Sequence, residues 1–394
     1  MDRGMESTAA VQLVEAAREG LKESHQAPWL ARVDAAYGAI RSAFERSSSD
    51  GETDAALTIA TGLEEYWPLR SKLAVGCEWL TRALQMEGGT TGRRADALRA
   101  LAQLEFARGH YKDSLHAYEA GLELYTDLDD AEHVVDSLCE IGFIAFIYGR
   151  FEWAIAVSED ARRRSRAAGF PAGAARALRN LALIAHARDE YEQAMILYEQ
   201  EVEILRGTAD RDALASALDV QGMTAARAGD VERAVACLEE SVELFESIGR
   251  VSSQALASIF LGDAERKRGD RRRARACFER SVELARGVGD AGGEGLALLH
   301  LGRLRRDGGE NDEVLGLIER SCALLREAQD TLWLAMALLD LGRLHRAEER
   351  VPAARECFEE SLRLHRELGD MTTTREVEYE LTLCAAPLVS ERGA

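Results

Sequence analysis

The chain has 394 residues, of which 46% are hydrophobic and 30% are charged, and only 5 are proline. This composition excludes a disordered polar segment, a collagen-like fibre and a disulfide-rich secreted scaffold, and the length is sufficient to bury a large core. The 49 basic and 69 acidic residues give a net charge of −20, which repels phosphate backbones, so we expect no direct nucleic-acid partner.

The sequence predicts a cytoplasmic protein that does not contact a membrane. No stretch approaches 18 uncharged apolar residues, the length that a membrane span requires. The first ten residues include Asp2 and Glu6 and lack the apolar region of a signal peptide. The seven cysteines lie far apart without a C-x-x-C pair, which favours reduced thiols over disulfides or a metal site.

We predict three parts along the chain. Residues 1–54 are expected to form an N-terminal helical leader, residues 55–384 a repeat domain, and residues 385–394 a flexible tail. The repeat domain is expected to hold eight repeats, of which the first is degenerate and has Gly76, Leu80 and Ala83 at the positions of a second helix.

A period of forty residues organises the chain from residue 102 onward. Small residues recur at this interval at Ala102, Gly142, Ala182, Gly222, Gly262, Gly302 and Gly342. Twelve residues after each stands a second mark, at Ser114, Ala154, Ala194, Ala234, Ala274, Val314 and Ala354. Four residues further on, six copies carry a larger side chain and one carries Ser158; the six are Tyr118, Tyr198, Leu238, Phe278, Ile318 and Phe358. Three residue positions that recur at constant spacing in seven copies predict a structural repeat.

Each repeat is predicted to be a pair of amphipathic helices joined by a tight turn. In residues 256–290 a first apolar stripe ends at Gly269-Asp270, and a second follows at Ala274, Phe278 and Val282. The same break recurs at Gly109-His110, Gly149-Arg150, Gly229-Asp230 and Gly309-Glu310, with weaker versions at Asp189-Glu190 and Glu349-Arg350. The small residues are expected to let neighbouring helices approach closely, since glycine inside a helix otherwise costs about 1 kcal/mol.

The spacing of small residue, glycine turn, alanine and aromatic residue resembles the tetratricopeptide repeat. The usual unit has about 34 residues. The forty-residue unit is similar to the longer variety found in kinesin light chain and in scaffold and peptide-sensor repeat proteins. The resemblance implies an all-α, right-handed α-solenoid of about eight helix pairs, and it does not specify a function.

The region before the repeats resembles the entry into the repeat domain of bacterial STAND-class ATPase transcriptional regulators. The residues that carry this resemblance are Trp67, Gly76, Trp79, Leu80, Ala83 and Leu84. The phosphate-binding pattern G-x-x-x-x-G-K-[ST] is absent, because no lysine follows a glycine in this chain. The resemblance therefore implies either the sensor part of such a regulator or a free-standing relative without the motor.

The resemblance also implies that the first helix of each repeat lines a concave groove. By spacing, the groove residues are Asp136, Glu140, Phe143, Phe146, Arg176, Arg179, Asn180, Leu183, His186, Asp219 and Met223. Later repeats contribute Asp263, Arg266, His300, Arg303, Asp340 and Arg343 at matching positions.

Two clusters within this set suggest recognition. Arg176, Arg179 and Asn180 share a helix face, and they could hold a carboxylate and an extended peptide backbone. The alternative is ordinary ion pairing of these arginines with Asp136 or Glu140 of the previous repeat. Phe143 and Phe146 could form an apolar floor beside them, with core packing as the alternative.

Catalytic patterns are weak throughout the chain. Neither H-E-x-x-H nor G-x-S-x-G occurs, and no cysteine and histidine form a recognisable nucleophile motif. Cys139 is better explained as a small packing residue. We therefore expect no catalytic residues and no cofactor, and an enzyme is kept as the alternative hypothesis.

The preferred hypothesis is a non-enzymatic interaction or regulatory module that binds a protein segment or peptide in its groove. The alternative is a small-molecule sensor or enzyme that uses a pocket formed by Phe143, Phe146, Arg176 and Arg179. A homodimer is a further open alternative, because the ends of a solenoid can associate.

Overall fold

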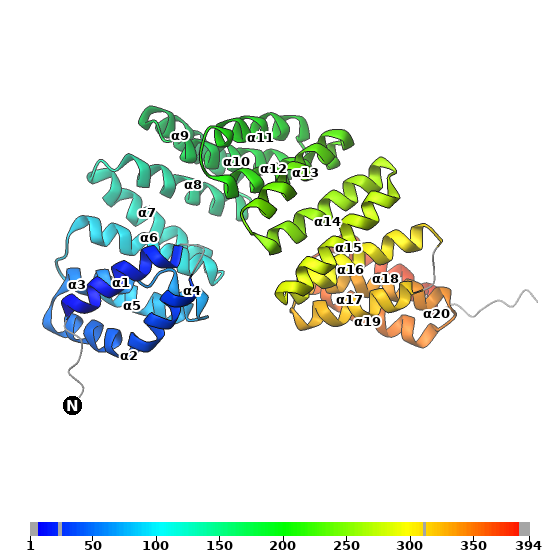
Figure 1. Ribbon diagram of the computed structural model, residues 1–394, viewed down its shortest axis with the longest axis horizontal. Helices are drawn as coiled ribbons and strands as arrows, with labels where there is room; N and C mark the ends of the chain where they lie inside the picture. The colour runs from blue at the N-terminus through cyan, green and yellow to red at the C-terminus, as the bar shows by residue number, and fades with distance from the viewer. Residues whose placement is uncertain (1–6, 23–25, 310–312, 386–394) are drawn as a thin grey trace, which may run out of the picture. The chain divides into compact units, whose positions relative to one another are not determined.

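The computed structural model describes residues 7–22, 26–309 and 313–385. Throughout these residues the regular secondary structure is helical, which confirms the predicted all-α solenoid class (Figure 1). The chain divides into two compact units, Met1–Ile204 (unit 1) and Leu205–Ala394 (unit 2), which we describe one at a time.

Unit 1 begins with helices that precede the regular pairs. These are α1 (Ser7–Lys22), α2 (Ala27–Asp50), α3 (Thr53–Thr61), α4 (Tyr66–Leu69) and α5 (Leu73–Gln85). Helices α1, α2 and α3 pack on one another, and α5 packs on α3. Their shared core is aromatic: Phe44 stacks on Trp79 with ring centroids 4.3 Å apart, and Trp67 meets Trp79 edge-on at 5.3 Å. Residues on both sides of the predicted boundary at residue 54 belong to this core.

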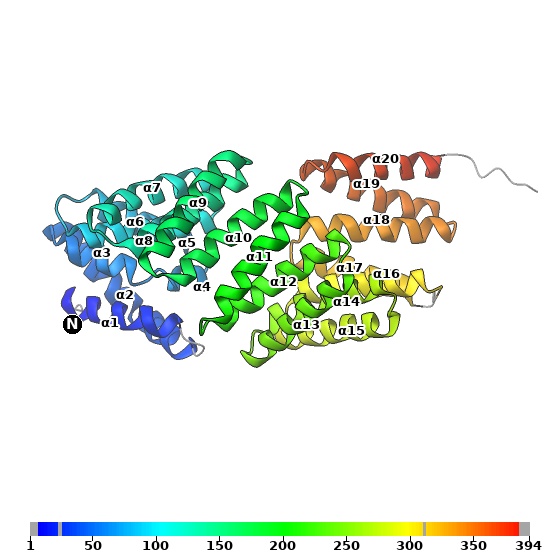
Figure 2. The same cartoon turned by 90° about the horizontal axis from the view of Figure 1, so that it is seen from above.

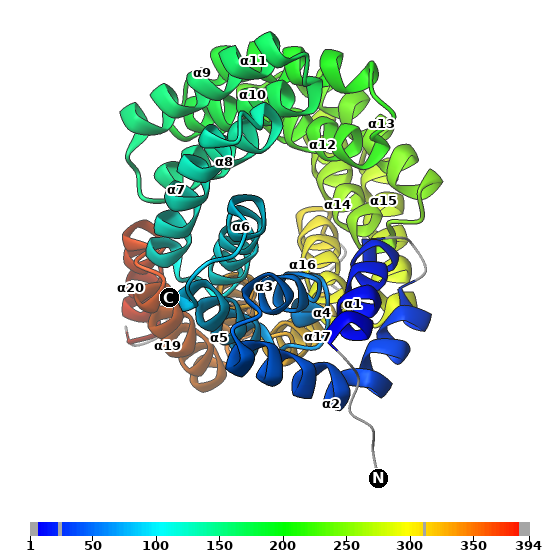
Figure 3. The same ribbon diagram turned by 90° about the vertical axis from the view of Figure 1, so that its left-hand side faces the viewer.

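The rest of unit 1 consists of helix pairs. They are α6 (Thr91–Ala107) with α7 (Tyr111–Asp127), α8 (Ala131–Ile147) with α9 (Phe151–Ala168), and α10 (Pro171–Ala187) with α11 (Tyr191–Arg206), which crosses the boundary between the units. Within unit 1 the first helices α6, α8 and α10 lie on the inner side, and α7 and α9 lie on the outer side (Figure 3).

Unit 2 continues the same pattern. Its pairs are α12 (Arg211–Ala228) with α13 (Val231–Ser247), α14 (Val251–Arg268) with α15 (Arg271–Val288), α16 (Ala291–Asp307) with α17 (Val314–Glu327), and α18 (Thr331–Ala347) with α19 (Val351–Glu367). A last helix, α20 (Met371–Ala385), packs on α19 (Figure 2).

The turns between helices use a left-handed residue about every twenty positions. The predicted breaks at Gly109, Gly149, Gly229, Gly269 and Gly309 all have positive φ, between 66° and 96°. The two weaker breaks are also confirmed, since Asp189 has φ 59° and Glu349 has φ 60°. Glycine adopts this conformation without strain, whereas other residues carry a cost there.

The recurring small residues make room for a side chain sixteen positions later. A Cβ built on Gly262 would lie 2.5 Å from the Phe278 ring, and one on Gly342 would lie 2.5 Å from the Phe358 ring. Gly302 faces Ile318 in the same way, at 2.6 Å. The expected close approach is therefore found, but it is between a helix backbone and a large side chain of the second helix rather than between two backbones.

Hydrogen bonds repeat with the same period. A buried serine on the second helix donates to a carbonyl oxygen of the first helix in four successive pairs: Ser241 to Ala215, Ser281 to Ala255, Ser321 to Gly295 and Ser361 to Ala335, at 2.6–2.9 Å. Aspartates cap many helix starts, as Asp270 does for α15 by accepting from the Arg273 N–H at 2.9 Å. Packing and local polar bonds thus act at the same positions of each repeat.

In the part of the chain that the structure describes, no helix combines the length and apolar character of a membrane span. The predicted tail lies outside the described residues from residue 386 onward, as does Glu310 of one predicted break.

Candidate functional site

The predicted groove residues lie on first helices, but they are divided between the two units. Asp136, Glu140, Phe143 and Phe146 are on α8, and Arg176, Arg179, Asn180, Leu183 and His186 are on α10, all in unit 1. Asp219 and Met223 are on α12 of unit 2. Most of these side chains are half-buried, and Asn180 is buried.

Arg176 forms an ion-pair cluster within unit 1. Its Nη1 lies 2.7 Å from Asp136 Oδ1, and its Nη2 lies 2.7 Å from Glu140 Oε1. Burial raises the pKa of the Glu140 carboxyl, and the positive charge of Arg176 opposes that rise. These contacts are the ion pairs with the previous repeat that the alternative interpretation of Arg176 describes.

The three polar side chains Arg176, Arg179 and Asn180 have different partners in the structure. Arg179 Nε donates instead to Glu201 Oε1 of α11 at 2.7 Å, and Asn180 Nδ2 donates to the Cys139 carbonyl oxygen at 2.7 Å. The reason is tertiary: each polar side chain finds a different partner on a neighbouring helix. Cys139 is buried, as expected of a packing residue.

Glu201 is a site that the sequence analysis missed. It occupies the repeat position of Ser241, Ser281, Ser321 and Ser361, yet it is a fully buried carboxylate. Burial raises the pKa of Glu201 to about 7, although Arg179 acts in the opposite direction. Aligning the repeats could have found it, because a carboxylate replaces a hydroxyl at a position that is otherwise serine in the following copies.

A cavity of about 280 Å³ opens beside the Arg176 cluster. Its lining is mostly charged and consists of Arg18, Glu64, Glu65, Arg99, Gln103, Tyr118, His133, Asp136, Ser137, Glu140 and Arg176. Glu64 joins two helices here, because it accepts from Arg18 Nε at 2.9 Å and from Arg99 Nη2 at 2.8 Å. Phe143, Phe146 and Arg179 do not line this cavity, so the predicted pocket of two phenylalanines and two arginines is not formed there.

Aromatic rings form a row next to this region. The Phe143 ring lies 5.9 Å from Phe106 and 6.1 Å from Phe146, and Phe146 lies 6.1 Å from Phe151. All four rings are half-buried, so each keeps part of its surface in contact with solvent. On α10, His186 meets Tyr191 edge-on at 5.4 Å, and Leu183 is half-buried. Half-buried aromatic rings offer apolar contact area to a ligand.

Asp219 carries an unsatisfied atom on α12. Within the described residues its Oδ1 is buried and has no hydrogen-bond partner. Burial raises the pKa of Asp219 to about 7. Met223, one turn further along, is half-buried.

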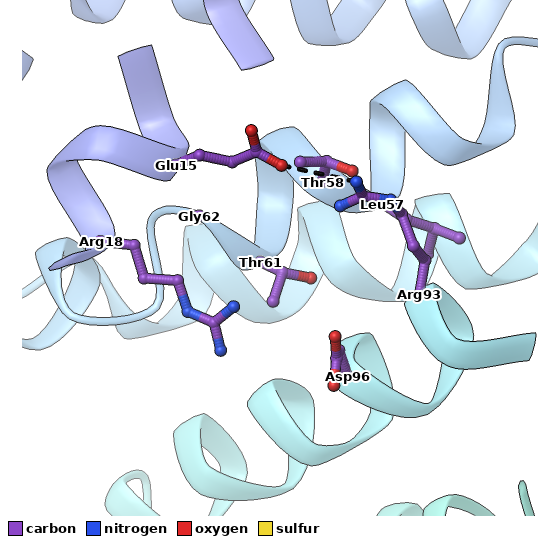
Figure 4. Close-up of a pocket in the computed structure, with 8 residues that line it drawn as sticks. All are labelled: Glu15, Arg18, Leu57, Thr58, Thr61, Gly62, Arg93 and Asp96. Atoms are coloured by element: carbon purple, nitrogen blue, oxygen red, sulfur yellow. Dashed lines mark hydrogen bonds and ion pairs between the residues drawn. The ribbon is translucent and has the colours of Figure 1, made fainter. Parts of the chain in front are cut away.

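A smaller cavity of about 40 Å³ lies between α1, α3 and α6 (Figure 4). Arg18 belongs to both this cavity and the larger one, and an ion pair between Arg93 and Glu15 (3.4 Å) lies at its edge. The volume suits a water-sized group and is too small for a peptide side chain.

One group of possible metal ligands occurs in the described parts of the chain: Glu105, His110 and Asp113. Arg108 already binds both Glu105 oxygens, at 2.9 and 3.0 Å, and His110 Nδ1 lies 2.8 Å from Glu105 Oε2. The carboxylate charge is thus balanced by protein groups, and two of the three residues are exposed.

Stacked helix pairs with small residues opposite large ones define a helical repeat solenoid. Two family models described as tetratricopeptide repeat match residues 173–247 and 334–368. The chain therefore carries tetratricopeptide repeats in these two segments.

Solved structures of the same fold cover most of the chain. The apo form of the quorum sensor NprR from B. thuringiensis has a TM-score of 0.61 at 14% identity, covering 90% of this chain and 97% of that chain. The apo form of RapI has a TM-score of 0.56 at 14% identity, covering 70% and 99%. A Rap protein complexed with Competence and Sporulation Factor has a TM-score of 0.51 at 11% identity, covering 96% and 98%.

No curated protein matches the sequence. The resemblance of the N-terminal region to STAND-class regulators is not tested by these comparisons and stays a prediction.

Proposed function

We propose that this chain is a protein-binding repeat module that takes a peptide or protein segment on the inner faces of its first helices. The observation that carries the proposal is the row of half-buried rings at Phe106, Phe143 and Phe146, which lies on the inner helices of unit 1. A preformed apolar row beside a charged cavity can hold a segment with little ordering of the protein.

The similar solved structures support a peptide or protein segment as the class of ligand. One of them is described as a quorum sensor, and another is a complex with Competence and Sporulation Factor. A cytoplasmic regulatory role, alone or as the sensor part of a larger regulator, is part of the proposal and agrees with the N-terminal resemblance.

A selection from a phage-displayed peptide library against the full chain tests the proposal. We expect enriched peptides that bind saturably in calorimetry and whose affinity falls at least tenfold when Phe143→Ala is introduced, since buried aromatic contacts dominate such interfaces. Leu128→Ala, which removes an exposed apolar side chain at the end of α7, is the control and should leave affinity unchanged.

Two results would count against the proposal. The first is the absence of any enriched peptide that binds the purified chain. The second is a saturable rise in melting temperature with a small metabolite in a thermal-shift panel and none with peptides, which would favour the small-molecule alternative.

A further inference from the structure

Helix α20 carries the two most exposed large apolar side chains of the described residues. Met371 is 63% exposed and Tyr379 is 62% exposed, whereas the other large apolar side chains in the described ranges are at most 50% exposed. α20 lies at the end of unit 2, with α19 and α18 packed on one side of it (Figure 2). Val377, Leu381 and Cys384 form that packed side. The opposite side of the helix faces solvent.

The solvent-facing side of α20 is the side that the earlier first helices of unit 2 bury. The residues one, two and three repeats before Tyr379 are at most 3% exposed: Leu339, Leu299 and Ile259. Thr382 is equivalent to Gly342, which packs against the Phe358 ring of its second helix. In each of those repeats the second helix runs antiparallel to the first and covers this side. The exposed side of α20 is therefore in the position that an antiparallel helix covers elsewhere.

Four exposed residues form a straight stripe along this side, which we call the α20 stripe: Thr372, Arg375, Tyr379 and Thr382. Their spacing of three and four residues is that of the a and d positions of a coiled coil, which place side chains on one line toward a partner helix. Met371 and Leu383 flank the stripe and add apolar surface to it.

The α20 stripe is complementary to itself when two copies run antiparallel. A twofold axis beside Val377 places Thr372 of one copy opposite Thr382 of the second copy, and Arg375 opposite Tyr379 of the second copy. Arg375 has no ion pair among the described residues, so its guanidinium group is available. A guanidinium group stacks well on the face of a tyrosine ring.

The acidic residues beside the stripe are already paired within the chain. Arg343 Nη2 donates to Glu376 Oε1 at 2.5 Å, and Arg366 Nη2 donates to Glu378 Oε1 at 2.7 Å. In a chain with a net charge of −20, two unpaired acidic surfaces would repel each other. Because these carboxylates have partners, two α20 helices can approach without that repulsion.

We propose that α20 is an interface between two copies of this chain, in which the two α20 helices pack antiparallel and Arg375 of each copy stacks on Tyr379 of the other. Arg375 stands where α18 and α16 have the buried small residues Ala335 and Gly295. An apolar second helix in this place would bury an unpaired charge, whereas a tyrosine ring leaves the edge of the guanidinium group in water. The proposal does not depend on peptide binding.

Sedimentation velocity with the full chain tests the proposal. The monomer has a mass of 43.3 kDa. An interface of one helix from each copy is small, so we expect a mass that rises toward twice this value between about 1 and about 200 μM. Tyr379→Ala should weaken the association about tenfold, because it removes the aromatic group at the centre of the interface. An unchanged melting temperature shows that the variant is folded.

Tyr148→Ala is the matched control. Tyr148 is an exposed tyrosine at the end of α8 in unit 1, and its removal should leave the association unchanged. The register is tested by mixing the Thr372→Cys chain with the Thr382→Cys chain in the presence of oxidised glutathione. We expect a disulfide between the two introduced thiols, identified by mass spectrometry of the linked peptides, because the antiparallel register brings these positions together.

Three results would overturn the inference. The first is the mass of a single chain at every concentration, and the second is an equal loss of association in Tyr148→Ala and Tyr379→Ala. The third is a mixture in which position 372 is linked mainly to position 372 of the second copy, since that product belongs to a parallel pair. These measurements contain no peptide, so failure here is distinguishable from failure of the proposed function.

Discussion

Replacing Glu201 with glutamine should remove a loss of folding stability that occurs in unit 1 as the pH rises. The carboxyl is fully buried, its Oε2 has no hydrogen-bond partner among the described residues, and its pKa rises from 4.5 to about 7. The folded state therefore binds a proton more tightly than the unfolded state. Stability is highest below pH 4.5, falls as pH rises through the interval from 4.5 to 7, and stays low above it.

The size of the effect follows from this interval. A rise in pKa from 4.5 to about 7 corresponds to about 3 kcal/mol of unfolding free energy once the group is ionised. Glu201→Gln cannot ionise and still offers an oxygen to Arg179, whose side chain is 33% exposed and can stay hydrated. The unfolding free energy of the variant minus that of the wild type should therefore increase by about 2 to 3 kcal/mol from pH 5 to pH 8.

Urea unfolding followed by circular dichroism at pH 5 and pH 8 measures this difference. Asp219 also titrates in this interval, but it is present in both proteins and cancels when they are compared. Glu243→Gln, at an exposed position of α13, is the control and should show no pH-dependent difference. If Glu201→Gln and the wild type differ by the same amount at both pH values, Glu201 ionises normally and the reasoning is refuted.

Three further predictions concern the repeat frame and its buried carboxylate. Glu349→Gly should raise stability by about 1 kcal/mol, measured by thermal unfolding, because glycine removes the strain of φ 60°. Gly262→Ala should lower stability by about 1 to 2 kcal/mol through contact with the Phe278 ring, whereas Gly38→Ala, inside α2 with nothing within 4 Å, should raise it by about 1 kcal/mol. Asp219→Asn should stabilise the chain at pH 8 and not at pH 4, since burial raises its pKa from 3.8 to about 7; equal effects at both pH values would contradict this.

The repeat fold could be predicted because its signals are local. A left-handed turn at Gly269 and a tight contact between Gly262 and Phe278 involve residues fewer than twenty positions apart. Both recur every forty residues, so each copy supports the interpretation of the others. Helices α1 and α2 precede the predicted repeats, and the aromatic core that they share with α3 to α5 depends on packing between segments that the pattern does not connect.

The unit 1 cavity could be predicted only in part. Asp136, Glu140 and Arg176 follow from the repeat register, and all three line the cavity. Arg18 precedes the predicted repeats and Glu64 lies in the degenerate first one, and no spacing in the sequence relates either residue to α8. Tertiary packing of the N-terminal helices against the first repeat brings them there.

The inner surface can change its chemistry without changing the fold, because the small residues and their large partners already fill the space between helices. The position after the small residue is Phe143 in one repeat and Arg303 in another, and both first helices keep the same length of 17 residues. Spacing alone therefore identifies which positions lie on the first helices but not which partners their side chains contact. Arg176 and Arg303 both lie on first helices, at different positions of the repeat, and they differ in their contacts. Both Nη groups of Arg176 bind carboxylates 36 and 40 residues away, whereas Arg303 donates through its Nε to Asp340. The presence of an arginine on a first helix therefore does not by itself show which of its donors are bound to carboxylates of the protein.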